Sequence, residues 1–240
     1  MNKPKIALAL DGQSAHSARR LTNNVGRLCH AVKIHDLLDS EGPYIHQRLK
    51  DAGARLVWVD YKLHDTEDTV ALRVKALVKN GAKIITVHCS GGVPMMKAAV
   101  EAAAGRCEIW AITLLTSLDD KQIERIYGTE RTRIQIVHEL ALMGKEAGVD
   151  GIVCSALEVG LLASSPELEG LVLAVPGTRS AGVALGQQKR SGTPAQAMAD
   201  GATLLVAGSQ VTKASDPLAA LIAMADEAGI VLEGIGDTVA

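Results

Sequence analysis

The sequence predicts an α/β protein that forms a single (β/α)8 barrel, the TIM barrel. Short apolar runs rich in β-branched residues alternate with Ala-rich amphipathic segments, as strands and helices do when they follow one another along a chain. The apolar runs have no alternating polar face, so we expect a parallel sheet covered by helices. Eight such units in 240 residues have the usual size of a barrel. No linker or shift of composition divides residues 1–240, so we expect one domain.

Taken in order, eight segments have the composition of strands, and a helical pattern follows each of them. These segments are 5–11, 30–35, 55–63, 83–89, 108–116, 151–156, 171–177 and 203–209. We expect the helix before the sixth strand to end at Gly148, in the C-terminal cap position. Asp216 and Pro217 are typical of the start of the last helix. An open doubly wound sheet is the alternative, but no GxGxxG follows the first strand.

Composition and charge exclude several classes of partner. The chain is 48% hydrophobic and 22% charged, as in ordinary soluble proteins, and its formal net charge of -2 argues against nucleic acid or an anionic membrane. It contains no Phe and few other aromatic residues, so a base-stacking platform is not expected. No apolar run approaches membrane-spanning length, and the N-terminus leads directly into a strand. The four cysteines are widely spaced, so we expect a reduced, cytoplasmic protein.

Polar residues stand at the carboxyl end of nearly every predicted strand, where a barrel has its active site. Lys33 is the clearest example, because it interrupts the apolar run AVKI at residues 31–34. A charge at such a position is costly unless it pairs or serves a ligand. The polar residues at these ends are Asp11, Lys33, Asp60, Lys62, His88, Thr116, Ser155, Arg179 and Ser209.

The segment 60–66, DYKLHDT, holds three charges of alternating sign after an apolar strand. On a strand, side chains two residues apart share a face, so Asp60 and Lys62 should project together. Asp65 lies where the strand gives way to a helix that begins near Thr66. A surface ion-pair ladder on an edge strand is the alternative to a functional site.

The loop after the seventh strand contains glycine and basic residues, PGTRSAG at residues 176–182 followed by QQKR at 187–190. Barrels commonly bind phosphate at the loops after strands seven and eight, through backbone N–H groups and a helix N-terminus. Gly177 and Gly208 fit that role, although a surface loop without a ligand has the same composition.

Together these motifs resemble the orotidine 5'-phosphate decarboxylase family in its short bacterial form, over essentially the whole chain. The DxKxxD motif of that family corresponds to Asp60, Lys62 and Asp65. The other matching motifs, in chain order, are ALD at 9–11, the lysine of KVG at Lys33, HxSGG at 88–92, LTS at 115–117, CSA at 154–156, PGxR at 176–179 and the QxR segment that begins at Gln188.

The chain departs from the family pattern at a few positions. Ser209 stands where the family has the arginine that pairs with the substrate phosphate. Gln187 replaces an acid of the phosphate loop, and Thr66 replaces an apolar residue of the pyrimidine pocket. His35 replaces the glycine of KVG.

The resemblance implies decarboxylation of orotidine 5'-monophosphate to uridine 5'-monophosphate, in pyrimidine biosynthesis, without a metal or an organic cofactor. Lys62 would donate the proton to the carbanion that loss of carbon dioxide leaves. Asp60 would disfavour the substrate carboxylate as a like charge. Lys33 and Asp65 would complete a Lys-Asp-Lys-Asp array, with Asp65 reaching the partner's site across a homodimer interface.

The same resemblance assigns the residues that bind the substrate. We expect them to contact three parts of the substrate: the ribose, the pyrimidine edge and the phosphate. Asp11 would bind the ribose, Ser155 the pyrimidine, with help from Thr116 and the partner's Thr69, and the phosphate would be held by Arg179, Gln188, Gly208 and Ser209.

Two other functions remain open at the level of sequence. Related barrels that share DxKxxD are magnesium-dependent sugar-phosphate decarboxylases and synthases, but those carry an acid where this chain has Lys33, which would repel a divalent cation. A catalytically impaired homologue that only binds its ligand is supported by Ser209. The intact charged motif argues against it, because unused buried charges cost stability.

Overall fold

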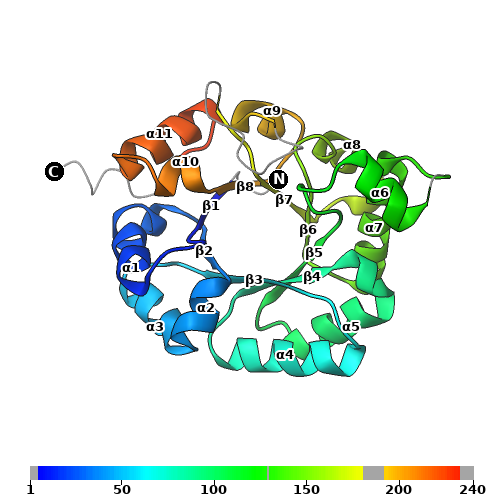
Figure 1. Cartoon of the computed structure of the whole chain (residues 1–240), viewed down its shortest axis with the longest axis horizontal. Helices are drawn as coiled ribbons and strands as arrows, with labels where there is room; N and C mark the ends of the chain where they lie inside the picture. The colour runs from blue at the N-terminus through cyan, green and yellow to red at the C-terminus, as the bar shows by residue number, and fades with distance from the viewer. Residues whose placement is uncertain (1–4, 129, 181–191, 233–240) are drawn as a thin grey trace.

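A computed structural model describes residues 5–128, 130–180 and 192–232, and its eight parallel strands close into a barrel. Each strand pairs with the next one in the chain, and β8 pairs with β1. Figure 1 looks along the barrel, with the helices as an outer ring around the strands. The predicted (β/α)8 barrel is confirmed.

All eight predicted strands are present, and each is shorter than predicted. They are β1 Lys5–Ala9, β2 Ala31–Ile34, β3 Val57–Leu63, β4 Ile84–His88, β5 Glu108–Ile112, β6 Gly151–Val153, β7 Val172–Pro176 and β8 Leu204–Ala207. The largest difference is at β5, where pairing with β6 stops at Ile112 although the apolar run continues. Apolar composition follows burial, whereas a strand ends where its ladder ends. Asp11, Thr116 and Ser155 therefore lie in loops, and Ser209 begins a short helix.

The bounds of the helices are α1 Ala15–Asn24, α2 Asp36–Glu41, α3 Tyr44–Asp51, α4 Glu67–Lys79, α5 Gly92–Ala103, α6 Asp120–Tyr127, α7 Arg133–Ala147, α8 Val159–Ala163, α9 Pro194–Ala199, α10 Ser209–Thr212 and α11 Pro217–Glu227. Several of the helices begin with a side-chain cap, among them α1, α6, α7, α9 and α11. Short 3-10 turns are η1 Gly26–Leu28, η2 Cys89–Gly91 and η3 Pro166–Leu168. The predicted ends are confirmed: α7 stops at Gly148, which has φ 80°, and the Asp216 side chain accepts the first N–H groups of α11.

The interior of the barrel is filled by two tryptophans in a chain that has no Phe. Trp58 on β3 and Trp110 on β5 meet edge to face, with ring centroids 4.8 Å apart. Small residues on β1 and β2, Ala7 and Ala31, leave room for the indoles in the same buried cluster. Trp58 also lines the pocket above it, so the packed interior forms the floor of the candidate site.

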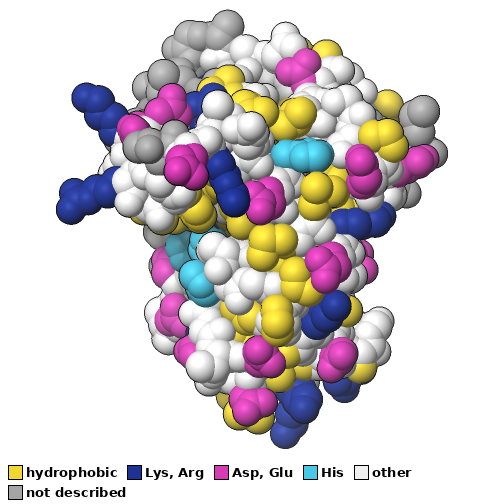
Figure 2. Space-filling view, turned by 90° about the vertical axis from the view of Figure 1, so that its right-hand side faces the viewer, with side chains coloured by type: hydrophobic (Ala, Val, Ile, Leu, Met, Phe, Trp, Pro, Cys, Tyr) yellow, Lys and Arg dark blue, Asp and Glu magenta, His cyan; other side chains and the backbone are white. Residues whose placement is uncertain are grey.

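The outer surface carries charges of both signs. On the face shown in Figure 2, acidic, basic and hydrophobic side chains are interspersed, so the described side chains there do not form a continuous basic surface of the kind that binds nucleic acid. Within the described part of the chain, every helix is too short or too polar to cross a membrane.

Candidate active site

A pocket of about 370 Å³ opens at the carboxyl end of the barrel. Its walls combine polar residues from the ends of several strands with an apolar floor that includes Trp58 and Ile112. The strand-end residues that sequence analysis selected and that line it are Asp11, Lys33, Asp60, Lys62, Thr116, Arg179, Gly208 and Ser209. Barrel enzymes carry out their chemistry at this end, because the loops that differ among them meet here.

Four of these side chains form a continuous row of alternating charge. The Lys33 Nζ lies 2.8 and 2.9 Å from the two carboxylate oxygens of Asp11. The same Nζ lies 3.1 Å from Asp60 Oδ2, which is 2.8 Å from the Nζ of Lys62. Lys33 is 5% exposed and Asp60 9% exposed, so their interactions are poorly screened by solvent. The row is Asp11, Lys33, Asp60, Lys62.

Neighbouring charges keep Asp60 and Lys33 ionised at neutral pH. Burial acts to raise the pKa of Asp60, but the ammonium groups of Lys33 and Lys62 oppose it and hold that pKa below its usual 3.8. Burial acts to lower the pKa of Lys33, and here the carboxylates of Asp60 and Asp11 prevail and raise it above 10.5. Each buried charge is therefore compensated by a neighbour of opposite sign.

The carboxyl end of β3 departs from regular strand geometry. Lys62 has φ 49°, and the pairing of β3 with β4 shifts register between Val59 and Leu63. The backbone N–H of Lys62 donates to the Thr86 hydroxyl at 3.0 Å, which itself donates to Asp60 Oδ1 at 2.8 Å. The side chains of Asp60 and Lys62 meet as predicted, but the backbone at Lys62 is not that of a regular strand, so strand alternation alone does not explain their contact. An uncommon backbone conformation and Thr86 place Lys62 over the carboxylate.

Thr86 was missed by sequence reasoning. It is fully buried in β4 between two apolar neighbours. A buried hydroxyl nearly always has a hydrogen-bond partner. A single polar residue within the apolar run IITV at residues 84–87 was the available sign.

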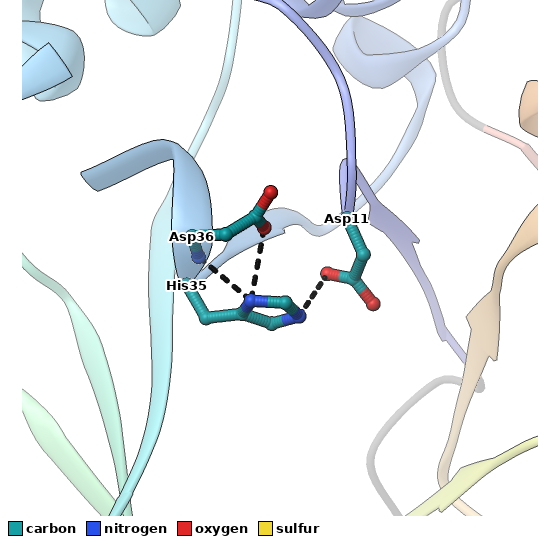
Figure 3. Close-up of side chains that lie close together, drawn as sticks. All are labelled: Asp11, His35 and Asp36. Carbon is teal, nitrogen blue, oxygen red and sulfur yellow. Dashed lines mark hydrogen bonds and ion pairs between the residues drawn. The ribbon is translucent and has the colours of Figure 1, made fainter. Parts of the chain in front are cut away.

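His35 extends the row beyond Asp11, and Figure 3 shows its ring beside the Asp11 carboxylate. Its Nε2 lies 3.1 Å from Asp11 Oδ1, and its Nδ1 lies 2.9 Å from Asp36 Oδ1. Burial acts to raise the pKa of Asp11, but hydrogen bonds from His35 and Lys33 and the charge of Lys33 lower it from 3.8 to about 2. Sequence analysis noted His35 as a replacement without predicting these contacts.

Asp11, His35 and Asp36 are the described residues whose spacing comes nearest to a metal-ligand set, with ligand atoms within 4.8 Å of one another. Lys33 already bonds both oxygens of Asp11. A divalent cation bound there would face this fixed positive charge at close range, so the donor set does not suit one.

The opposite end of the pocket, after β7 and β8, has fewer charged contacts. The Arg179 guanidinium lies 3.4 Å from the Ser209 hydroxyl and donates to the Thr178 carbonyl at 2.9 Å. Thr212 and the exposed Lys213 line the same end. Gln188 lies outside the described residues.

Three predicted site residues lie away from this pocket. Ser155 is fully buried, and its hydroxyl donates to the carboxylate of Glu158. Asp65 is exposed, and its carboxylate accepts the N–H of Thr66 at 2.7 Å. The Thr69 hydroxyl lies 2.9 Å from that of Thr66. The pocket of a single chain therefore does not contain Asp65 or Thr69.

His88, at the end of β4, lies near the row without lining the pocket. Its ring centroid is 5.5 Å from that of His64. Burial is the largest cause that lowers its pKa to about 4, with His64 and Lys62 acting in the same direction, so its imidazole is neutral at pH 7.

The fold and this pocket are those of a barrel enzyme, with ion-paired lysines and aspartates lining the pocket at the carboxyl end of the strands. Comparison with known proteins identifies the family to which this enzyme belongs. The chain belongs to the Orotidine 5'-phosphate decarboxylase / HUMPS family, whose model matches residues 4–224.

Individual relatives agree with this family. An orotidine 5'-phosphate decarboxylase of Streptococcus pneumoniae serotype 19F is 40% identical over 192 residues, which are 80% of this chain and 82% of that protein. The enzyme of the same name from Moorella thermoacetica is 37% identical, and the matched region covers 94% of this chain and 92% of that protein. The crystal structure of orotidine 5'-phosphate decarboxylase from Lactobacillus acidophilus has a TM-score of 0.80 at 28% identity and covers 94% of this chain and 99% of that one.

Proposed function

We propose that this protein decarboxylates orotidine 5'-monophosphate to uridine 5'-monophosphate and carbon dioxide, without a metal or an organic cofactor, as a step of pyrimidine biosynthesis. The observation that carries the proposal is the row of paired charges that ends at Lys62 in the pocket. The relatives named above support the same substrate.

Lys62 would act on the atom that loses carbon dioxide. Departure of carbon dioxide leaves an electron pair on ring carbon six of the pyrimidine, and a fixed ammonium beside it stabilises that charge. The same ammonium then donates a proton to the carbon, which completes the product. Asp60 holds Lys62 at 2.8 Å, so the cation is positioned before the substrate binds.

Asp60 would also act on the substrate carboxylate. Lys33 and Lys62 keep the Asp60 carboxylate ionised, so a second carboxylate beside it is repelled in the bound substrate and relieved when carbon dioxide leaves. Lys33 joins Asp60 to Asp11 and prevents the two acids from repelling one another.

Asp65 and Thr69 would complete the site of a partner subunit in a homodimer. Asp65 is exposed and lies outside the pocket of its own chain, although it belongs to the same DxKxxD motif as the two pocket residues. A carboxylate supplied in this way would face Lys62 of the other subunit and complete the Lys-Asp-Lys-Asp array.

The remaining pocket residues would bind the nucleotide. Asp11 is partly exposed to the pocket and would accept a ribose hydroxyl, while Thr116 would assist. Arg179, Gln188, Ser209 and backbone N–H groups near Gly208 would hold the phosphate. Ser155 has the least support, because its hydroxyl already donates to Glu158.

The two alternatives fit the site less well. Magnesium-dependent chemistry requires a cation where the ammonium of Lys33 lies between Asp11 and Asp60. An inactive binding protein would have no use for the buried charges of Lys33 and Asp60, whose burial is costly.

The test is turnover of orotidine 5'-monophosphate by the purified protein in metal-free buffer, followed by uridine 5'-monophosphate formation. We expect activity that a chelator leaves unchanged. Activity that depends on added magnesium would favour the metal-dependent relatives, and binding without turnover would favour the inactive homologue.

A further inference from the structure

His35 lies between two carboxylates at the rim of the pocket, in the turn that joins β2 to α2. Its Nε2 lies 3.1 Å from Asp11 Oδ1, and its Nδ1 lies near both the backbone N of Asp36, at 2.7 Å, and Asp36 Oδ1, at 2.9 Å. Figure 3 shows the ring with Asp11 on one side and Asp36 on the other. A glycine at this position, as in the family pattern that the chain resembles, offers none of these contacts.

The two contacts of Nδ1 belong to different protonation states. In the neutral ring, Nδ1 accepts the Asp36 N–H and the proton is on Nε2, which donates it to Asp11. In the protonated ring both nitrogens donate, and Nδ1 then faces the Asp36 carboxylate. Nε2 donates to Asp11 in both states. Protonation therefore changes the charge of the ring and the partner of Nδ1, but not the donor that holds Asp11.

His35 and Asp36 hold Asp11 from two directions. Asp36 Oδ2 accepts the backbone N–H of Gly12 at 3.1 Å, directly after Asp11 in the chain. The Asp11 carboxylate itself has about four acceptor positions, of which Lys33 uses two and His35 one. The remaining position is available to a ligand in the pocket. The contacts from His35 and Lys33 together set the direction in which the remaining acceptor position of Asp11 points.

The charges around His35 favour its protonated form. The groups that face it are Asp11 after β1, Asp36 at the start of α2 and Lys33 on β2, so two carboxylates oppose one ammonium. The hydrogen bond to Asp11 is the largest cause that raises the pKa of His35 above 6.5, against the effect of burial. The ring therefore keeps its charge to a higher pH than a free histidine does.

We propose that His35 is a positioning residue for Asp11, and that protonation of its imidazole tightens the hold on the carboxylate that binds the ribose. The affinity for the nucleotide then depends on pH through a residue that touches neither the reacting carbon nor the phosphate. This inference rests on the proposed function, in which Asp11 accepts a ribose hydroxyl.

The first experiment compares the KM for orotidine 5'-monophosphate of the native protein and of His35→Gln between pH 6 and pH 9. Glutamine keeps an N–H donor but cannot be protonated. The KM ratio between the two proteins cancels ionisation of the substrate phosphate. We expect His35→Gln to have a KM about tenfold higher at pH 6, because a hydrogen bond to a charged group is stronger when the donor is also charged.

At pH 9 we expect the two KM values to agree, and kcat to change by less than about twofold throughout, since His35 does not act on the transition state. His35→Gly should have a higher KM than His35→Gln at every pH. His16→Gln, which changes an exposed histidine of α1, serves as the control and should match the native protein. A KM ratio that does not vary with pH, or a loss confined to kcat, would overturn the proposal.

A second measurement separates this role from the proposed function. The NMR titration of His35, identified by the resonance that His35→Gln lacks, should move to lower pH in Asp11→Asn, because the neighbouring charge is removed. A midpoint that stays in place would overturn the coupling. If the native protein does not turn over the substrate, the proposed function fails, whereas active protein with a constant KM ratio rejects only the role of His35.

Discussion

The two ends of the pocket differ in how firmly their polar groups are held. At the end formed by β1, β2 and β3, each charge contacts an opposite charge at 2.8 to 3.1 Å, and Lys33 and Asp60 are almost completely buried. At the end formed by β7 and β8, Ser209 and Lys213 are exposed, and Arg179 contacts a neutral hydroxyl at 3.4 Å. The pocket therefore combines a tightly ion-paired end with an end whose polar groups Ser209 and Lys213 are exposed to solvent.

This difference shows where substitution is tolerated. Replacing Lys33 or Asp60 would take away the opposite charge that compensates a buried neighbour, which is destabilising. At the exposed position 209 the chain has serine where the family pattern has arginine. This difference lowers the expected affinity for an anion but leaves no buried charge without a partner. The predictions below test this contrast, from the largest expected effect to the smallest.

Lys62→Ala should lower decarboxylation by about ten-thousandfold or more, because it removes both the charge beside the carbanion and the proton donor, each worth at least about a hundredfold. Single-turnover assays with orotidine 5'-monophosphate measure the loss, and thermal unfolding checks the fold. Lys50→Ala, at an exposed position of α3, is the matched control. Substantial activity in folded Lys62→Ala would remove Lys62 from the proposed mechanism.

Mixing Lys62→Ala with Asp65→Ala should restore activity if two subunits share each site. Each variant alone lacks one member of the array, but a mixed dimer has one site with both native residues and one with neither. Complete exchange should then recover up to about a quarter of the native activity. Exchange is measured by native mass spectrometry. Mixed dimers without recovered activity would contradict the shared site.

Ser209→Arg should raise kcat/KM for orotidine 5'-monophosphate by about tenfold, near 1.4 kcal/mol, because arginine forms a bidentate charge-assisted pair with phosphate. The unphosphorylated nucleoside is the control substrate and should not respond. An equal response to both substrates, or none, would show that other groups already satisfy the phosphate.

Lys213→Ala should lower kcat/KM for the monophosphate by about fivefold, a smaller effect because an exposed ammonium is screened by solvent. Lys213 lines the pocket with Ser209 and Thr212 and is a candidate for the cation that Ser209 does not supply. Lys121→Ala, on the exposed face of α6, controls for the change of net charge. If both variants lose the same activity, Lys213 has no specific role.

The row should also stabilise the fold in a pH-dependent way. The pKa of Asp11 is about 2 in the folded protein against 3.8 for the free side chain, so its contribution is complete above pH 3.8 and is lost as the pH falls through 2. The Asp11 side chain is 42% exposed, so we discount the contribution to about 1 kcal/mol.

Urea unfolding of the native protein and of Asp11→Asn, at pH 7 and pH 3, measures this contribution. We expect the difference between the two proteins to shrink at the lower pH. Asp226→Asn, on the exposed side of α11, should show no such change. A difference that is constant with pH would mean that Asp11 stabilises the protein through packing and not through its charge.

The sequence by itself determined the barrel, the order of its strands and most of the pocket residues. Composition, periodicity and the caps at Gly148 and Asp216 are local properties, and they are legible in any short window of the chain. Lys33 and the motif at residues 60–65 were identifiable because charges are rare at buried positions of a strand.

Only the tertiary structure decided where strands end and which polar groups meet. The hydrogen-bond ladder of β5 stops where β6 stops, and the sequence of residues 113–116 does not indicate this end. Thr86 reaches Asp60 across 26 residues, and His35 reaches Asp11 across 24. Such contacts depend on the register between neighbouring strands and on the positive φ of Lys62, and both are set when the barrel closes. The physical reason is that hydrogen bonds and ion pairs depend on distances between elements, whereas sequence patterns report burial within each element.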